Sequence, residues 1–149
     1  MKNLQNASVV SATRILVIED NPSDVCLLDR ALKKQGLRFE LIHLLNGREG
    51  LAFIRRQGAY HEAALPDLIL LDLNLTPYTG EDLSREIRAA KHLDSVPVCV
   101  WSSSQSRRDQ SLILSLGVAC FITKPTGLDQ FMGIGLIIKN LIRRVPEPD

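Results

Sequence analysis

Apolar residues follow two different patterns along this chain. Runs dominated by aliphatic and β-branched residues occupy 14–18, 40–45, 67–74, 97–101 and 119–122. Between the runs, apolar residues recur every three or four positions, as Val25, Leu28 and Leu32 do. Short apolar runs are typical of buried strands, whereas the longer spacing is typical of one face of a helix. The pattern therefore predicts strands and helices in strict alternation.

Residues that favour helix ends lie between the apolar runs. Four residues suited to cap a first turn are Asn21, Asn46, Ser106 and Thr126. Gly80 opens a further helix, and Gly36, Gly58 and Gly117 end three of them. We therefore expect helices that cover about 22–35, 46–58, 80–90, 106–117 and 126–144.

Alternating strands and helices with short connections imply an α/β fold with a doubly wound parallel sheet and right-handed crossovers. The run 67–74 is bounded by Pro66 and by a Thr76-Pro77 turn, and its aliphatic centre predicts a central strand that is buried on both faces. We expect one domain over 14–145, a disordered leader at 1–13 and a tail at 146–149.

Composition narrows the function classes. The chain has 149 residues, is 45% hydrophobic and carries a formal net charge of +1, which suits one ordinary globular domain. Basic and acidic residues are mixed throughout, so neither nucleic acid nor a membrane surface is an expected partner. The first residues are polar, and no apolar run reaches the roughly 20 residues that span a bilayer. We expect a cytoplasmic protein.

Cysteines and histidines show no metal-ligand spacing. Cys99 and Cys120 lie within predicted strands, so we expect them, like Cys26, to be reduced structural thiols rather than disulfide partners. The three histidines, His43, His61 and His92, are scattered, and we interpret them as ordinary surface or packing residues. Trp101 should point away from Ser102 and pack under a helix, because side chains alternate along a strand.

Polar residues stand where the chain leaves the predicted strands. Glu19 and Asp20 follow the first strand, Asp72 the third, Ser102 the fourth and Lys124 the fifth. Parallel strands bring their carboxyl ends to one edge of a sheet, which is where open α/β folds place ligands. The five side chains are therefore expected around one site.

This set of groups indicates a particular chemistry. Three neighbouring carboxylates repel one another and so imply a cation, and Mg²⁺ prefers oxygen ligands of this kind. A metal site beside a lysine and a hydroxyl group is what phosphoryl transfer requires. The pattern predicts Asp72 as the nucleophile, with Lys124 and Ser102 binding phosphoryl oxygens and with Asp20 and Asp72 as the main metal ligands.

The same residues resemble a known family, the receiver domains of two-component response regulators. The resemblance covers about 14–144 and rests on Glu19-Asp20, Asp72, Asn74, Gly80, Ser102 and Lys124-Pro125. It implies the flavodoxin-like fold of five parallel strands in the order 2-1-3-4-5. It also implies that a histidine kinase phosphorylates Asp72, and that the domain is a phosphoacceptor rather than an enzyme, limited to self-phosphorylation from small donors and self-dephosphorylation.

Several residue roles follow only from this resemblance. The backbone carbonyl of Asn74 would bind the metal, and Glu19 would do so directly or through water. Ser102 and Phe121 would form a switch, with its readout on the face made by the fourth helix, fifth strand and fifth helix. The Lys124–Pro125 peptide bond would be cis. The chain departs from the family at Thr76, where a proline is usual.

A closer likeness is to the single-domain regulators of phytochrome-type histidine kinases. It rests on 19–24, 55–60, 72–75, 123–125 and 129–131. With few residues after the last helix, we expect no DNA-binding output module, so that output would be a change of partner or of oligomeric state.

Three other functions compete with this interpretation. Residues 72–76 approximate the Asp-x-Asp-x-Thr motif of haloacid-dehalogenase-type phosphatases, but Asn74 stands at their general acid, and turnover of a phosphate monoester would discriminate. A flavodoxin needs a phosphate-binding loop that 19–22 does not offer, and bound flavin would reveal one. A pseudo-receiver would bind partners without being phosphorylated.

The last predicted helix is apolar on nearly all sides. Phe131, Ile134 and Ile138 lie along one broad face, and Leu136 and Ile137 point in neighbouring directions. Such a helix is buried on more than one side, either within its own domain or in a dimer. Gly133 and Gly135 would let another helix approach closely. We expect a two-fold homodimer through this helix, which a charge at Ile138 should disrupt.

Overall fold

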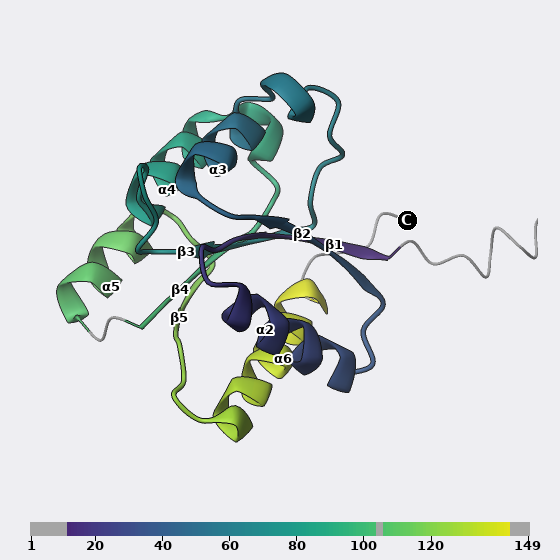
Figure 1. Cartoon of the computed structure of the whole chain (residues 1–149). Coiled ribbons are helices and arrows are strands. Elements are labelled where there is room, and N and C mark those ends of the chain that lie inside the picture. The colour runs from purple at the N-terminus through teal and green to yellow at the C-terminus, as the bar shows by residue number, and fades with distance from the viewer. Residues whose placement is uncertain (1–11, 104–105, 144–149) are drawn as a thin grey trace, which may run out of the picture.

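Strands and helices alternate throughout the part of the chain that the structure, a computed structural model, describes, which is residues 12–103 and 106–143 (Figure 1). In chain order the elements are β1 (Thr13–Ile18), α2 (Pro22–Lys34), β2 (Phe39–Leu44), α3 (Gly47–Ile54), the 3-10 turn η1 (Gly58–Tyr60), β3 (Leu68–Asp72), α4 (Gly80–Ala89), the 3-10 turn η2 (Lys91–Leu93), β4 (Val98–Ser102), α5 (Arg107–Ser115), β5 (Cys120–Thr123) and α6 (Leu128–Arg143).

The strands form one parallel sheet in the order β2-β1-β3-β4-β5. This confirms the predicted doubly wound fold and its strand order. All five residues of β3 are buried, as expected for the central strand. The first strand begins at Thr13, which pairs with Phe39, so the last residue of the expected leader belongs to the sheet. Residues 1–11 and the predicted tail lie outside the described residues.

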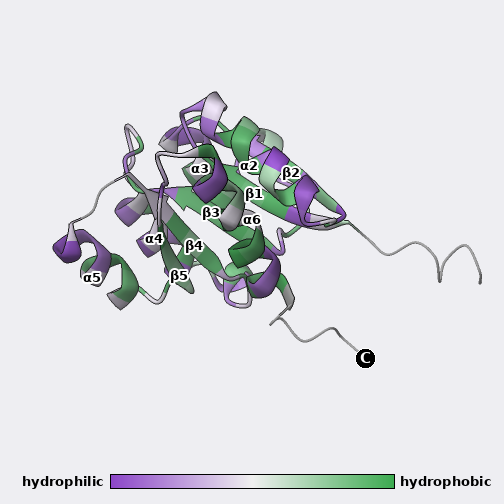
Figure 2. Ribbon diagram, turned by 90° about the horizontal axis from the view of Figure 1, so that it is seen from below, coloured by the Kyte–Doolittle hydropathy of each residue, from purple (hydrophilic) through white to green (hydrophobic). Residues whose placement is uncertain are grey.

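Two apolar layers cover the two faces of the sheet. Along β1, Ile15 and Val17 point to the layer under α2 and α6, while Leu16 and Ile18 point to the layer under α3, α4 and α5. Figure 1 shows these two groups of helices on opposite sides of the strands. In Figure 2 the central strands are hydrophobic over most of their length. The alternation follows from the pleat of a strand that is covered on both sides.

Capping residues fix the helix starts that the sequence predicted. The side chain of Asn21 accepts a hydrogen bond from the Ser23 amide, and that of Asn46 accepts one from the Glu49 amide. α3 ends earlier than expected, at Ile54, because Arg56 turns the chain with a φ of 55° before Gly58 is reached. α4 begins at Gly80 behind a capping box made by Thr79 and Asp82.

The expectation of reduced thiols is wrong for two of the three cysteines. The register of β4 and β5 places Cys99 directly opposite Cys120, with 4.8 Å between their Cα atoms, and the two form a disulfide. Such a Cα separation lies in the range that a disulfide spans. Strand register is a tertiary property, so the spacing in the sequence could not reveal the pair. Cys26 is free and exposed.

α6 has one buried side and one exposed side. Phe131, Ile134 and Ile138 are at most 3% exposed and pack against the sheet, whereas Leu136 and Ile137 are 50% and 43% exposed. The expectation that Ile138 lies in a dimer interface is therefore wrong, because its side chain belongs to the core of its own domain. Among the described helices, none is long and apolar enough to cross a membrane.

Candidate functional site

The carboxyl end of β3 carries Asp72, the last residue of the strand. The chain then turns sharply, and the Gly80 amide at the start of α4 donates to the Leu73 carbonyl at 2.9 Å. A Cβ atom at Gly80 would lie only 2.5 Å from the Asp72 carbonyl oxygen, so glycine is required there. The start of α4 therefore packs directly against the backbone at the end of β3, next to Asp72.

Three acids meet at this edge. Carboxylate oxygens of Glu19, Asp20 and Asp72 lie within 4.8 Å of one another. Glu19 is fully buried and Asp72 is 4% exposed, while Asp20 is exposed to solvent. The three residues line an open cleft with a volume of about 400 Å³. The structure therefore brings together the acids that the strand exits predicted.

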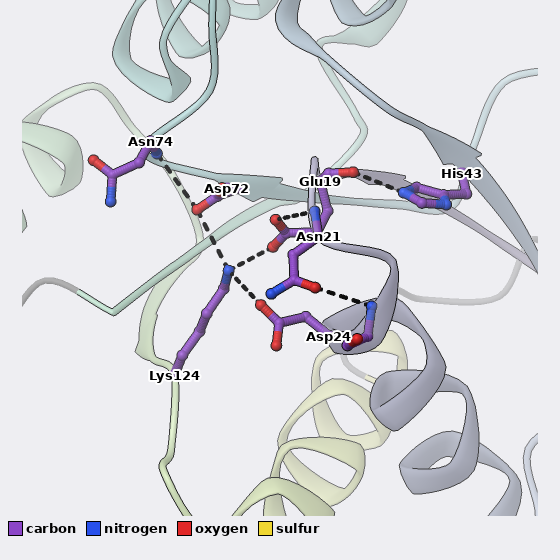
Figure 3. Close-up of polar contacts among 8 residues, drawn as sticks. Glu19, Asn21, Asp24, His43, Asp72, Asn74 and Lys124 are labelled. Carbon is purple, nitrogen blue, oxygen red and sulfur yellow. Dashed lines mark hydrogen bonds and ion pairs between the residues drawn. The ribbon is translucent and has the colours of Figure 1, made fainter.

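Lys124 reaches into the same cleft from the end of β5. Its Nζ lies 2.6 Å from Glu19 Oε1, 2.9 Å from Asp24 Oδ2 and 3.6 Å from Asp72 Oδ1 (Figure 3). Asp24 stands in the first turn of α2. No sequence motif indicated that it would touch Lys124, because the contact spans 100 positions.

Trp101 lies beneath the Lys124 ammonium group. The distance from Nζ to the ring is 4.9 Å, within the range of a cation–π interaction. The indole is fully buried and meets the Phe131 ring of α6 edge-on at 5.9 Å. The prediction that Trp101 packs under a helix is confirmed.

Burial and neighbouring charges shift two ionisable groups of the site. The pKa of Glu19 is raised to about 7, mainly by desolvation and also by the charge of Asp72, although the hydrogen bond and the charge of Lys124 act in the opposite direction. Burial alone would lower the pKa of Lys124, but hydrogen bonds to Glu19 and Asp24 and the charge of Asp72 outweigh it and raise that pKa. The ammonium group is thus firmly charged, whereas the Glu19 carboxyl titrates near neutral pH.

Backbone contacts complete the frame of the site. The Asn74 amide donates weakly to Asp72 Oδ1 at 3.4 Å, and the Asn21 amide donates to Glu19 Oε2 at 3.1 Å. His43 Nε2 lies 2.7 Å from the Glu19 carbonyl oxygen, so it fixes the end of β1 from the neighbouring strand. No sequence pattern indicated this role of His43, since only the parallel register of β1 and β2 brings it there.

The two expected switch residues lie on adjacent strands. Ser102 is fully buried at the end of β4, one residue beyond Trp101, which pairs with Asp72. Its carbonyl accepts a hydrogen bond of 2.7 Å from the Lys124 amide. Phe121 pairs with Val100 and packs, partly buried, against the layer under α3, α4 and α5. Their roles stay predictions.

The predicted cis bond is wrong. Among the described residues the cis peptide bond joins Thr76 and Pro77, and the Lys124–Pro125 bond is not cis. An X-Pro bond prefers trans by only about 0.5–1 kcal/mol, so surrounding structure decides the isomer at each proline. The presence of proline after Lys124 could not by itself determine which isomer this bond adopts.

Two properties of the cleft suit a hard divalent cation. All three acids offer oxygen ligands, and one of them, Asp20, is open to water, which such an ion retains in its shell. Burial and the neighbouring charge of Asp72 raise the pKa of Glu19 and so disfavour its charged form, which a bound cation would favour. Glu19, Asp20 and Asp72 are the residues that would hold it.

Comparison with known proteins identifies the family. The sequence matches the response regulator receiver domain over residues 15–134. The chain is a receiver domain. Receiver domains take a phosphoryl group from a histidine kinase onto an aspartate.

Individual relatives agree with this assignment. The response regulator Rcp1 of Synechocystis sp. is 37% identical over 114 residues, which cover 76% of this chain and 78% of that protein. The phosphorylated cyanobacterial phytochrome response regulator RcpA has a similar structure, with 34% identity and a TM-score of 0.84 over 92% of this receiver domain and 98% of RcpA. The Mn²⁺-bound form of Rcp1 is 33% identical, with a TM-score of 0.83 over 92% and 99% of the two chains.

Proposed function

We propose that Asp72 is the residue that accepts the phosphoryl group in this receiver domain. One observation carries the proposal: Asp72 is the only acid of the described cleft that lies at the exit of the central strand and within 3.6 Å of the Lys124 ammonium group. Its carboxylate belongs to the acidic cluster and also lies next to the positive charge of Lys124. Phosphoryl transfer depends on such placement, because the protein mainly positions groups and stabilises charge.

The transfer itself makes one bond and breaks one. An Asp72 carboxylate oxygen bonds to phosphorus while the bond from phosphorus to the kinase histidine nitrogen breaks, and the electron pair of that bond returns to the imidazole. Lys124 Nζ binds one phosphoryl oxygen, and the Ser102 hydroxyl donates to another. The residues that would hold a Mg²⁺ ion are Asp20 and Asp72, Glu19 directly or through water, and Asn74 through its backbone carbonyl. Such an ion would neutralise further negative charge during the transfer.

Intact mass spectrometry tests the assignment. After incubation with Mg²⁺ and acetyl phosphate, we expect the mass of one phosphoryl group on the wild type and none on Asp72→Asn. Asp67→Asn is the matched control, because Asp67 lies just before the other end of β3, where it accepts a hydrogen bond from the Arg14 amide. An adduct that persists in Asp72→Asn would overturn the proposal.

We infer that the output surface is the face made by α5, β5 and α6. Ser102 and Phe121 lie on the two strands next to that face, and the Lys124 amide is bonded to the Ser102 carbonyl. A phosphoryl group that draws the Ser102 hydroxyl towards Asp72 would free space for Phe121 to turn. These two local movements, of the Ser102 hydroxyl and of the Phe121 ring, would shift the equilibrium between two conformations of this face.

The proposed kinase is of the phytochrome type. The support is the similarity to RcpA, a phytochrome response regulator, over 92% of this chain. The domain then acts as a cytoplasmic phosphoacceptor rather than as an enzyme with a substrate to turn over. Neither nucleic acid nor a membrane is part of this proposal.

A homodimer through α6 is the proposed assembly. Its support is the outer side of α6, where the neighbouring residues Leu136 and Ile137 are 50% and 43% exposed. Exposed apolar side chains gathered on one element mark interaction sites. Gly133 adds to this surface, since a Cβ there would meet no atom within 4 Å other than those of its chain neighbours and of its own helix backbone.

A further inference from the structure

Asp24 has a contact that the proposed phosphoryl-transfer chemistry does not use. Its Oδ2 lies 2.9 Å from Lys124 Nζ, which is shorter than the 3.6 Å between that ammonium group and Asp72. Both side chains of this pair are largely shielded, with 19% of Asp24 and 13% of Lys124 exposed. A shielded ion pair at hydrogen-bond distance is a real constraint on where the lysine points.

Asp24 differs from the other two carboxylates that touch Lys124. Glu19 and Asp72 both belong to the acidic cluster that can hold a cation, whereas Asp24 does not. When a cation neutralises the cluster, Asp24 keeps its full attraction for the ammonium group. It comes from α2, on the opposite side of the lysine from the end of β3 (Figure 3).

We propose that Asp24 is a positioning residue that holds the Lys124 ammonium group while Asp72 is unmodified and competes for it once Asp72 carries a phosphoryl group. The inference rests on the proposed function of Asp72 and Lys124. Asp24 in α2 and Asp72 at the end of β3 lie on opposite sides of the ammonium group, so a movement of Nζ towards one carboxylate lengthens its distance to the other. Asp24 therefore weakens the hold of the site on the phosphoryl group.

Binding of a phosphoryl analogue measures this competition. Beryllofluoride is titrated in the presence of Mg²⁺ against the wild type, Asp24→Asn and Asp24→Glu. We expect Asp24→Asn to bind the analogue about tenfold more tightly. The variant loses the charged hydrogen bond between residue 24 and Lys124, which stabilises the protein without bound analogue. Asp24→Glu keeps the charge and should remain within about twofold of the wild type.

A matched control separates the contact from the general charge of the helix. Asp29→Asn also removes a carboxylate from α2, but Asp29 pairs with Lys33 at 2.9 Å and not with Lys124. We expect no change in analogue affinity for this variant. Equal tightening in Asp24→Asn and Asp29→Asn would overturn the inference.

Lys124→Ala shows whether Asp24 acts through the lysine. In that background, Asp24→Asn should lose most of its tenfold gain. The emission of Trp101, the only tryptophan of the chain, gives the same test without ligand, because the ammonium group lies over its ring. Asp24→Asn should change this emission when Lys124 is present and leave it unchanged in Lys124→Ala.

The outcomes separate two failures. If the wild type binds no analogue, or if Asp72→Asn still binds it, the proposed function is wrong and this inference falls with it. If the wild type binds at Asp72 but Asp24→Asn binds no more tightly, only the role of Asp24 is wrong. A full gain in the Lys124→Ala background would mean that Asp24 acts by its own charge, which also overturns the inference.

Discussion

Glu19 combines burial with neighbouring negative charge at the scale of single residues. Its side chain is fully buried, yet it must share an edge of the sheet with Asp20 and Asp72. Lys124 at 2.6 Å relieves part of the conflict, but burial still raises the pKa of the carboxyl to about 7. Replacement of Glu19 by an apolar residue would avoid the cost of burying its charge, but it would also remove one of the three carboxylates that could bind a cation.

The stability of the metal-free protein should fall as pH rises. The ordinary pKa of Glu19 is 4.5 and its folded value is about 7, so between these values the folded protein holds a proton that the unfolded chain has lost. This group should therefore lower the free energy of unfolding by on the order of 3 kcal/mol from pH 4.5 to pH 7. Urea unfolding in a chelator, repeated across this range, measures the slope.

Glu19→Gln provides the comparison for that profile. Glutamine does not titrate, so this part of the pH dependence should flatten. The same slope in the variant and the wild type would show that another group is responsible.

α6 illustrates how one element can serve two surfaces. Its inner side packs on the sheet and on α2, where a Cβ at Gly135 would lie 2.4 Å from the Ala31 carbonyl oxygen. Its outer side holds Gly133, with open space around it. Two glycines that look alike in the sequence therefore have different roles. Gly135 allows α2 to approach within the domain, and Gly133 leaves room on the outer surface.

Alanine at these two positions should shift stability in opposite directions. Gly133→Ala should stabilise the protein by up to about 1 kcal/mol, the difference in helix propensity. Gly135→Ala should destabilise it, because the new methyl group meets backbone atoms of α2 that cannot move cheaply. Denaturant midpoints of the two variants decide the matter, and a stabilised Gly135→Ala would contradict the close packing of α2 on α6.

At the scale of the whole molecule, the same two sides of α6 distinguish folding from assembly. Ile137→Asp places a charge on the outer side and should give a folded monomer. Ile138→Asp places a charge in the core and should lower the free energy of unfolding by several kcal/mol. Sedimentation at micromolar concentration, in the presence and absence of phosphorylation, reports the first effect, and circular dichroism the second. A wild type that is monomeric in both states would rule out the dimer.

The sequence by itself determined the alternation of elements, the parallel sheet and the acids, serine and lysine at its carboxyl edge. Each of these depends on short-range periodicity or on the rule that parallel strands end on one side, so a linear pattern contains it. Asp72 and Lys124 could be paired without coordinates for that reason, although 52 positions separate them.

Only the tertiary structure decided which side chains touch across elements. The Cys99–Cys120 pair depends on strand register, the Asp24–Lys124 contact on how α2 sits against β5, and the burial of Ile138 on how α6 lies on the sheet. The cis bond at Thr76–Pro77 rather than at Lys124–Pro125 likewise depends on surroundings. These contacts join residues far apart in the chain, and their energies depend on distances of a few ångströms that no local pattern specifies.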